Sequence, residues 1–444
     1  MKKVLILGAG LVAKPIVEYL LANNFSIIIA SPMKHRADEM INGNPLGSSL
    51  DWSMDDPATL ERLVSENDIT VSLLPYKYHP DVAKACLKNR RPLVTTSYVQ
   101  QAMQELNDEA KKTGIILLNE MGLDPGLDHM TAMRVIDRIH GKGGKVEELY
   151  SLCGALPAPE AADNPLGYKF SWSPKGVILA SRNGALFLKK GRRISIKPID
   201  LFRETFIYDF PGIGDMEVYP NRDSISYKDI YNIPEASTIY RGTLRYRGWC
   251  ETLDAMKRLS MLDDTPNDYS GMSYADFLAE RAGDGKRNIM RKISLKLGVS
   301  EKSKVIQAFE WLGFFSEEKM NYGETTSFEI TSDRMIGRMD MADNERDMVA
   351  MQHVLLASFP DGKREVRKSY LLDFGTPATN TAIARTVALP AAIAVKLILS
   401  GAIRTKGVLR PVLPEIYNPV LDELKSLEIE IKEESDLPES DIVF

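Results

Sequence analysis

The chain has 444 residues, which is too long for one hydrophobic core, so we expect two or three domains. Hydrophobic residues make up 44% and charged residues 26%, a composition typical of soluble globular proteins. The formal net charge of −5 gives no electrostatic reason to expect a nucleic-acid partner.

The N-terminal stretch carries the most informative pattern. Residues 3–7 form a short apolar run typical of a buried strand, the glycine-rich turn 8–13 follows, and apolar residues at helical spacing occupy 14–23. This strand–GxGxxA–helix order is that of a dinucleotide site, because free backbone N–H groups and a helix N-terminus then face the pyrophosphate. The alternative is a glycine-rich turn that serves packing alone.

The next hundred residues continue this alternation. Strands are predicted at 26–30, at a run ending near 50–51, and at 69–74, 92–96 and 115–118; helices are predicted at 38–42, 57–64, 80–88 and 100–113. Six strands alternating with helices predict a doubly wound parallel sheet, a Rossmann fold, whose ligands bind at the carboxyl ends of the strands. Polar and turn residues gather at these ends, at Gly8, Ser31, Asp51, 74–76, 97–98 and 119–124.

The end of the second strand bears on which dinucleotide is bound. A carboxylate there selects NAD, but this chain has Ser31 followed by Lys34, His35 and Arg36. A 2′-phosphate suits Ser31 together with Lys34 or Arg36, which favours NADP(H). The alternative is that these basic residues only begin a solvated helix.

Beyond residue 120 the alternation stops. We expect a helix at 130–140, then a second domain of strands and loops from Val146, and helical segments at 277–282, 289–297 and 303–311. The runs 348–358 and 364–373 predict a hairpin around Pro360-Asp361-Gly362. An apolar helix after Gly375 is expected to return to the first domain, followed by a charged helix from Leu421 and a short acidic strand.

Cellular location is indicated by three features. Cys86, Cys153 and Cys250 are odd in number and lack metal-ligand spacing, which favours a reducing compartment and predicts no metal. The N-terminus enters a strand at once and leaves no room for a signal peptide. The longest apolar stretch, 386–403, contains a proline and a lysine and is expected to be a buried helix, so we expect a cytoplasmic enzyme without a membrane partner.

A second group of polar residues follows the first domain. It is rich in Arg, Lys, Ser and Thr beside glycines and prolines, and consists of Cys153, Lys169, Ser173, Arg222, Thr243 and Arg245. Arginine is suited to a planar carboxylate because it donates two parallel hydrogen bonds. Several such groups fit a substrate with more than one carboxylate.

These blocks carry a family resemblance. The chain resembles the NADP-dependent, glutamate-forming saccharopine dehydrogenases in GAGLVAKP, TVSLLPY, VTTSYV, NEMGLDPGLDH, CGALPAPE, DNPLGYKFSWSPKGV, YPNRDS, RGTLRYRG and GAIRTKGVLRP. The match runs through residues 1 to about 250 and is loose near 253–330. The family places an arginine after the residue that matches Ser31, where this chain has Pro32, so NADP preference has to rest on Ser31 with Lys34 or Arg36.

The resemblance implies an α/β architecture and a homodimer. The expected domains are an NADP-binding Rossmann domain (1–122 with about 375–415), an α/β or α+β substrate and dimerisation domain (123–252 with about 335–374), and a helical subdomain (253–334). It further implies NADP(H) contacts from Gly8, Ala9, Gly10, Leu11, Val12, Ser31, Lys34, Asp51, Leu74, Thr95, Thr96, Ser97, Leu123 and Ser173. The implied substrate contacts are Ser97, Tyr98, Asp124, Arg222, Thr243, Leu244 and Arg245.

The implied reaction interconverts saccharopine and water with L-glutamate and 2-aminoadipate 6-semialdehyde, by hydride transfer through an imine. Asp124 is the first candidate for proton transfer, followed by Tyr98 and Cys153. Competing interpretations make Asp124 a helix N-cap and Cys153 a small buried residue. By the same reasoning His129 is structural, and His79 is a cap or surface group.

Two other functions stay open on the sequence. One is a related imine-forming reductase with a different amine, similar to carboxynorspermidine synthase, which needs fewer carboxylate-binding groups. The other is a non-catalytic NADP-binding regulator, which leaves the dense polar groups beyond residue 150 without a use.

Overall fold

The computed structural model describes residues 1–283, 285–377 and 380–443, and the chain divides into two compact units. Unit 1 comprises Met1–Glu147, Asp229–Glu235 and Met351–Ile442, and unit 2 comprises mainly Glu148–Lys228 and Ala236–Ala350. Residues 284 and 378–379, which fall in the predicted segments 253–334 and 375–415, lie outside the described residues. The three-domain division stays a prediction.

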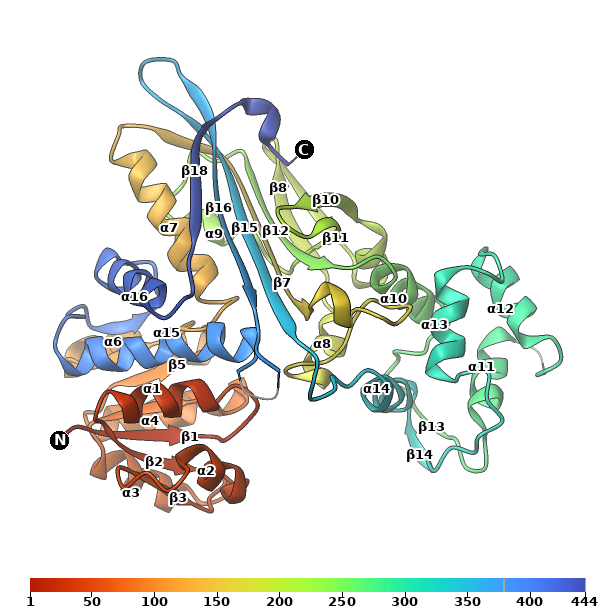
Figure 1. Ribbon diagram of the computed structural model, residues 1–444, viewed down its shortest axis with the longest axis horizontal. Coiled ribbons are helices and arrows are strands. Elements are labelled where there is room, and N and C mark those ends of the chain that lie inside the picture. The colour runs from red at the N-terminus through yellow and green to blue at the C-terminus, as the bar shows by residue number, and fades with distance from the viewer. Residues whose placement is uncertain (284, 378–379, 444) are drawn as a thin grey trace. The chain divides into compact units, whose positions relative to one another are not determined.

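Unit 1 contains the predicted parallel sheet (Figure 1). Its strand order is β17-β6-β5-β4-β1-β2-β3, and every neighbouring pair is parallel. The strands are β1 (Lys3–Leu7), β2 (Ser26–Ala30), β3 (Gly47–Leu50), β4 (Ile69–Ser72), β5 (Leu93–Thr95), β6 (Ile116–Leu118) and β17 (Gly407–Leu409). The six predicted strands are confirmed, and the sequence missed β17.

Unit 1 also contains helices, several of which pack against this sheet. They are α1 (Lys14–Ala22), α2 (Lys34–Ile41), α3 (Pro57–Glu66), α4 (His79–Lys88), α5 (Gln101–Gln104), α6 (Asn107–Thr113), α7 (Leu127–His140), α15 (Ala382–Leu399) and α16 (Pro414–Ser426). Four predictions were inexact. Three helices begin earlier than expected: α2 by four residues, α7 by three and the charged helix α16 by seven. The helix expected at 100–113 is two helices, because residues 105 and 106 lie between α5 and α6.

The apolar helix α15 returns to the N-terminal elements, as predicted. It runs alongside α1 and packs against β4 and β5 (Figure 1). It is long and apolar enough to cross a membrane, with a mean hydropathy of 1.9, but 72% of that stretch is buried in the protein. This burial is what a core helix requires, since its apolar side chains are already removed from water.

Most of the remaining strands belong to a second, mixed sheet. β15 (Asp347–Ser358), most of which belongs to unit 1, and β16 (Arg364–Phe374) form the predicted hairpin. β18 (Lys432–Leu437), the expected acidic strand, pairs antiparallel with β16. In unit 2 the order is β10-β11-β12-β7, with β12 parallel to β7 and antiparallel to β8. These strands are β7 (Lys145–Pro157), β8 (Ala185–Lys189), β9 (Arg192–Ile196), β10 (Phe206–Phe210), β11 (Gly214–Pro220) and β12 (Thr238–Arg245).

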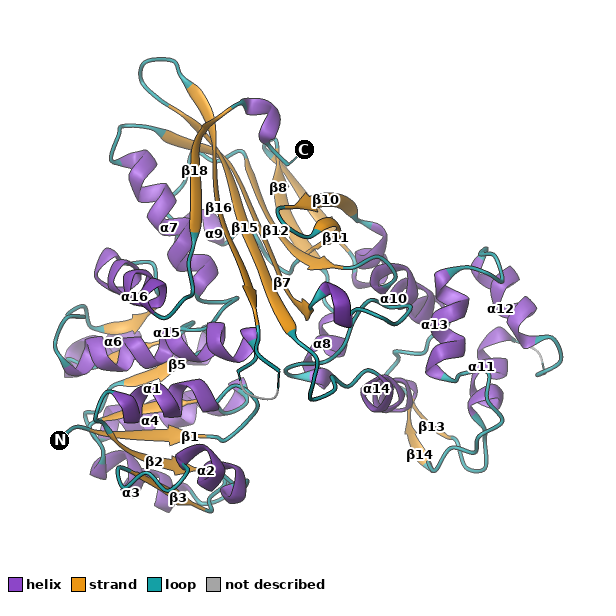
Figure 2. Ribbon diagram, in the orientation of Figure 1, coloured by secondary structure: helices purple, strands orange, loops and turns teal. Residues whose placement is uncertain are grey.

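Unit 2 also holds several helices and a two-stranded ribbon (Figure 2). They are α8 (Pro174–Ala180), α10 (Trp249–Arg258), α11 (Tyr274–Ala282), α12 (Ile289–Leu297), α13 (Lys304–Leu312) and α14 (Ser327–Arg338), with the ribbon β13 (Pro266–Asp268) and β14 (Glu324–Thr326). The short helix α9 (Tyr227–Ile230) joins the two units in sequence. The three predicted helical segments are confirmed as α11, α12 and α13.

His79 is a buried connector in unit 1, so its prediction as a cap or surface group was wrong. It is the first residue of α4 and only 4% exposed. Its Nδ1 lies 3.0 Å from Ser72 Oγ at the end of β4, and its Nε2 lies 3.0 Å from Ser97 Oγ beyond β5. Burial lowers the pKa of His79 to about 4, so the ring is neutral at pH 7.

This lowered pKa predicts a loss of stability in weak acid. The unfolded chain protonates His79 near its ordinary pKa of about 6.5, whereas the folded chain does not until about 4. Between these values the unfolded state binds more protons, so the free energy of unfolding falls as the pH drops, by about 2 kcal/mol at about pH 5. Urea denaturation followed by circular dichroism at several pH values measures this fall.

The matched comparison uses two substitutions. His79→Gln removes the titrating ring and is expected to flatten that part of the pH profile, whereas His35→Gln, at an exposed histidine, leaves it unchanged. A His79→Gln protein with the full wild-type pH dependence contradicts the prediction.

Candidate active site

The glycine-rich turn has the geometry of a phosphate cradle. Gly8 has a φ of +104°, and its N–H donates to Ala30 O at 2.9 Å, which fixes the turn that joins β1 to α1 against the end of β2. A Cβ built on Gly10 meets no atom within 4 Å among the described residues, so there is open space beside that backbone. Helix α1 starts directly after Ala13 with a proline in its first turn. Its N-terminal N–H groups and dipole suit a pyrophosphate, so the site fits a dinucleotide.

At the end of β2 the basic residues differ in what they contact. Ser31 is buried, and its Oγ accepts from Met33 N–H at 3.1 Å. Lys34 forms an ion pair with Asp38 at 2.7 Å on its own helix. Arg36 has the weaker partner, the sulfur of Met33 at 3.9 Å. Arg36 is therefore the better candidate for a 2′-phosphate, because the charge of Lys34 is already neutralised by a carboxylate.

Other predicted cofactor residues lie along the same edge of the sheet. Thr95 is buried and donates its hydroxyl to Asn119 Oδ1 at 3.1 Å, so that hydroxyl serves the fold. Asp51 is exposed just beyond β3. The others are half-buried or buried around the strand ends: Leu74, Thr96, Ser97 and Leu123.

Tyr98 and Asp124 form the polar pair at this edge. The Tyr98 hydroxyl donates to Asp124 Oδ1 at 2.6 Å, and Asp124 is half-buried. The N-cap interpretation of Asp124 was wrong: the N-cap of α7 is Gly126, whose N–H donates to Asp128 Oδ1 at 2.6 Å. The Tyr98 phenol therefore lies within proton-transfer distance of the Asp124 carboxylate.

Behind this pair lies a network that the sequence did not reveal. His129 is fully buried, and its Nε2 lies 2.6 Å from Glu120 Oε2, a placement consistent with the structural role predicted for it. Glu120 is also buried. The sequence placed Glu120 in the NEMGLDPGLDH block and in the polar stretch 119–124 at a strand end, but gave it no role.

In unit 2, three neighbouring strands place the predicted residues on one face. Tyr219 on β11 pairs with Thr243 on β12, and Thr243 pairs with Cys153 on β7. Residues two apart on a strand share a face, so Arg245 joins this group, whereas Leu244 points to the opposite side and is fully buried. Burial raises the pKa of the Tyr219 phenol, which stays protonated and can donate.

Arg245 is a buried cation without a carboxylate partner in the described part of the chain. It is 5% exposed, and one guanidinium N–H donates to Leu244 O at 2.8 Å. The guanidinium carbon lies 4.9 Å from the Tyr168 ring, 5.5 Å from Trp249 and 5.9 Å from Tyr219. The aromatic faces offset part of the free-energy cost of burying this charge, and an anionic ligand beside the guanidinium could offset the rest.

The other polar residues of this unit are placed differently. Lys169 is held by Asp163 at 2.9 Å and by Glu345; burial lowers the pKa of Lys169, but these two carboxylates more than offset that effect and raise it. Arg222 is exposed with a φ of +45°, and Ser173 is exposed at the N-cap of α8. Lys169 is therefore a structural ion-pair residue.

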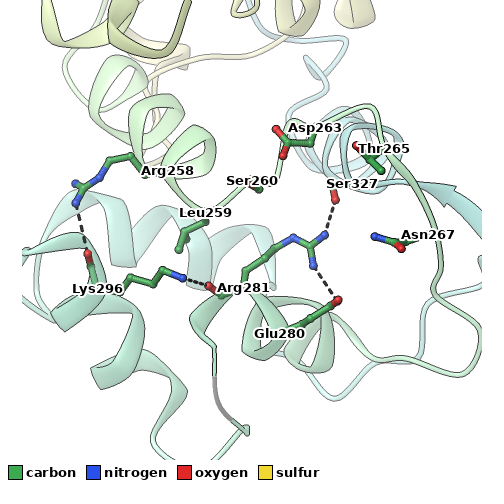
Figure 3. Close-up of a pocket in the computed structure, with 10 residues that line it drawn as sticks. All are labelled: Arg258, Leu259, Ser260, Asp263, Thr265, Asn267, Glu280, Arg281, Lys296 and Ser327. Atoms are coloured by element: carbon green, nitrogen blue, oxygen red, sulfur yellow. Dashed lines mark hydrogen bonds and ion pairs between the residues drawn. The ribbon is translucent and has the colours of Figure 1, made fainter.

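A separate hollow of about 300 Å³ lies among the helices of unit 2 (Figure 3). Its basic side chains contact protein groups: Arg281 donates to Ser327 and lies 3.1 Å from Glu280, and Lys296 Nζ donates to Arg281 O at 2.5 Å. The predicted site residues are not among the described residues that line it. We therefore assign these cations to the packing of α10, α11, α12 and α14.

Known proteins resemble the chain along its whole length. Residues 4–118 match the saccharopine dehydrogenase NADP binding domain, and residues 122–429 match the saccharopine dehydrogenase C-terminal domain. The L-glutamate-forming, NADP(+) saccharopine dehydrogenase of Saccharomyces cerevisiae is 39% identical over 96% of this chain and 97% of its own. The mitochondrial alpha-aminoadipic semialdehyde synthase of Bos taurus is 36% identical over 96% of this chain and 47% of its own.

A solved structure agrees with these matches. The apo saccharopine dehydrogenase (L-Glu forming) from Saccharomyces cerevisiae has a TM-score of 0.90 at 38% identity and covers 98% of this chain and 100% of that one. The predicted fold class is thereby confirmed. The chain belongs to the saccharopine dehydrogenase family.

Proposed function

We propose that this chain is an NADP(H)-linked, L-glutamate-forming saccharopine dehydrogenase of lysine metabolism. The observation that carries the proposal is its similarity to the Saccharomyces cerevisiae enzyme of that name, over 96% of this chain and 97% of the relative. The reaction converts saccharopine, water and NADP⁺ into L-glutamate, 2-aminoadipate 6-semialdehyde, NADPH and a proton, and it is reversible.

The chemistry sets what the protein has to do. Saccharopine is a secondary amine, and hydride leaves the carbon beside its nitrogen to give an imine. Bound NADP⁺ supplies the hydride acceptor. Water then adds to the imine carbon, and the carbon–nitrogen bond breaks as the nitrogen regains a proton. The protein must therefore accept a proton from water and return one to the leaving amine.

Asp124 and Tyr98 suit these proton transfers. The carboxylate of Asp124 can accept a proton as water attacks, and the phenol at 2.6 Å holds that carboxylate in one orientation. Cys153 stays a third candidate; it is a buried free thiol in register with Thr243.

Arg245 and Thr243 suit a substrate carboxylate. A carboxylate beside the Arg245 guanidinium gains charge-assisted hydrogen bonds where little water competes. For NADP(H), the turn around Gly10 and the start of α1 suit the pyrophosphate, and Ser31 with Arg36 suits the 2′-phosphate.

A homodimer and a cytoplasmic location are part of the proposal. The family resemblance supports the dimer. The free state of Cys86, Cys153 and Cys250, all buried, supports a reducing compartment. The formal charge of −5 supports small-molecule substrates rather than nucleic acid.

The direct test of this function is turnover. With L-glutamate and 2-aminoadipate 6-semialdehyde, the absorbance of the reduced nicotinamide is expected to fall, and faster with NADPH than with NADH. No turnover with either cofactor contradicts the proposal. Equal turnover of an amine without the glutamate carboxylates favours the reductase similar to carboxynorspermidine synthase.

Substitution at Arg36 tests the cofactor preference. Arg36→Ala is expected to raise the KM for NADPH by roughly 10- to 100-fold, the value of a charge-assisted hydrogen bond, and to leave the KM for NADH unchanged. Lys34→Ala is the matched control and has a smaller effect, because Lys34 already pairs with Asp38. Equal effects of Arg36→Ala on both cofactors contradict this assignment.

Substitution at Arg245 tests the carboxylate site. Arg245→Met is expected to raise the KM for saccharopine by roughly 100-fold, because a buried charge pair is lost. The melting temperature of the protein without substrate is expected to stay level or rise, since an unpaired buried charge does not stabilise the fold. Lys169→Met, which breaks two ion pairs, lowers the melting temperature instead. A lower melting temperature with an unchanged KM assigns Arg245 to the fold.

A further inference from the structure

The segment Ser97–Tyr98–Val99 follows β5 and is held at each of its three residues. The Ser97 hydroxyl lies 3.0 Å from His79 Nε2, and its carbonyl accepts from Glu120 N–H at 3.2 Å. The Tyr98 hydroxyl donates to Asp124 at 2.6 Å. The Val99 N–H donates to Glu120 Oε1 at 2.8 Å. Glu120 therefore binds the segment on both sides of Tyr98, through its backbone and through its side chain.

Glu120 collects three donors from distant parts of unit 1. Besides the Val99 amide, its carboxylate lies 2.6 Å from His129 Nε2 on α7 and 3.0 Å from Arg410 Nε, just after β17. The residue is 2% exposed, so water competes little with these bonds. Charge-assisted bonds of this kind are the stronger ones in a buried setting.

The backbone of Glu120 is strained in a way that needs a reason. Its φ is +60°, the left-handed region that a side chain other than glycine, asparagine or aspartate rarely adopts. Such a conformation costs on the order of 1 kcal/mol and persists only where surrounding contacts hold it. Here the three hydrogen bonds to the carboxylate hold this conformation. The strained backbone is therefore what puts the carboxylate within reach of its three donors.

The carboxylate is also fixed in its charged form. Burial by itself raises the pKa of Glu120, but the hydrogen bonds and charges of His129 and Arg410 and the Val99 amide more than offset this and lower it. The donors to this carboxylate are the Val99 amide, His129 and Arg410, so its charge is used within the protein. Its part is to hold other groups in place.

We propose that Glu120 is a positioning residue for the Tyr98–Asp124 pair: by joining the Val99 amide, His129 and Arg410 on one carboxylate, it fixes the Ser97–Val99 segment and thereby the direction of the Tyr98 hydroxyl. The kinetic part of this inference rests on the proposed function, whereas the structural part does not. His129 and Arg410 act through Glu120 rather than on the substrate.

Hydrogen exchange tests the structural part. Glu120→Gln keeps the side-chain length but removes the charge and replaces one of the two acceptor oxygens by an NH₂ group, which cannot accept a hydrogen bond. The weaker hold on the segment is expected to accelerate the exchange of the Val99 amide. The control Glu423→Gln removes another carboxylate of unit 1, which accepts from Tyr19 and from Lys396 at 2.5 Å, and leaves Val99 protected. Wild-type protection of Val99 in Glu120→Gln overturns the proposal.

Kinetics test the positioning role. Glu120→Gln is expected to lower kcat by roughly 10- to 100-fold, the usual effect of a small misplacement of a catalytic group, with little change in the KM for NADPH. In a protein that already carries Tyr98→Phe, Glu120→Gln is expected to lower kcat little further, because the hydroxyl that Glu120 positions is then absent. Additive losses, or an unchanged kcat, overturn the proposal.

A second variant guards against misfolding. Arg410→Lys keeps a cation near Glu120 but loses the guanidinium geometry. We expect it to lower kcat by less than Glu120→Gln does. In the Tyr98→Phe background this loss of kcat is expected to be absent. An Arg410→Lys loss of the same size in both backgrounds overturns the proposal. A wild-type protein with no turnover refutes the proposed function, and the hydrogen-exchange result then decides on Glu120 alone.

Discussion

The parallel run of the first sheet is the constraint on which the rest of unit 1 depends. Because all its strands point the same way, every strand releases its chain at the same edge, and residues far apart in sequence meet there. The glycine turn follows β1, Ser31 follows β2, and the Ser97–Val99 segment follows β5. The parallel direction of the strands therefore brings three features to one edge of the sheet. They are the phosphate cradle, the residues suited to a 2′-phosphate and the Tyr98–Asp124 pair.

The two buried charged residues Glu120 and Arg245 differ in how many of their hydrogen bonds the protein itself supplies. Glu120 is surrounded by donors from its own unit and is satisfied before any ligand arrives. Arg245 is buried against aromatic rings with one backbone acceptor, so its remaining capacity is suited to a ligand. The contrast fits the tasks proposed for them: a group that orients neighbours needs internal partners, whereas a group that binds substrate must leave its strongest interaction unmade in the free protein.

Much of the fold was predictable because its signals are local. Apolar runs of strand length and the turn from Gly8 to Ala13 identified six strands and the first helix, and the blocks around Tyr98, Asp124 and Arg245 indicated the site. Strand β17 was missed because it has only three residues, too few to show the alternation of apolar and polar residues that identifies a strand. His79 was assigned to the surface because a histidine at a helix start is usually solvated, and only the fold brings two serines to its ring. Glu120 was missed for the same reason, since Arg410 lies 290 positions away.

The order in which the sheet is completed has a consequence for synthesis on the ribosome. Strand β17 and helix α15, which finish and cover a sheet begun at residue 3, are encoded almost at the end of the chain. A nascent polypeptide therefore carries β6 with an unpaired side, and an uncovered apolar surface over β4 and β5, until nearly all of it has emerged. An incomplete sheet of this kind is prone to aggregate and is the sort of surface that chaperones bind. A premature stop codon before residue 409 leaves the nucleotide-binding sheet without its last strand.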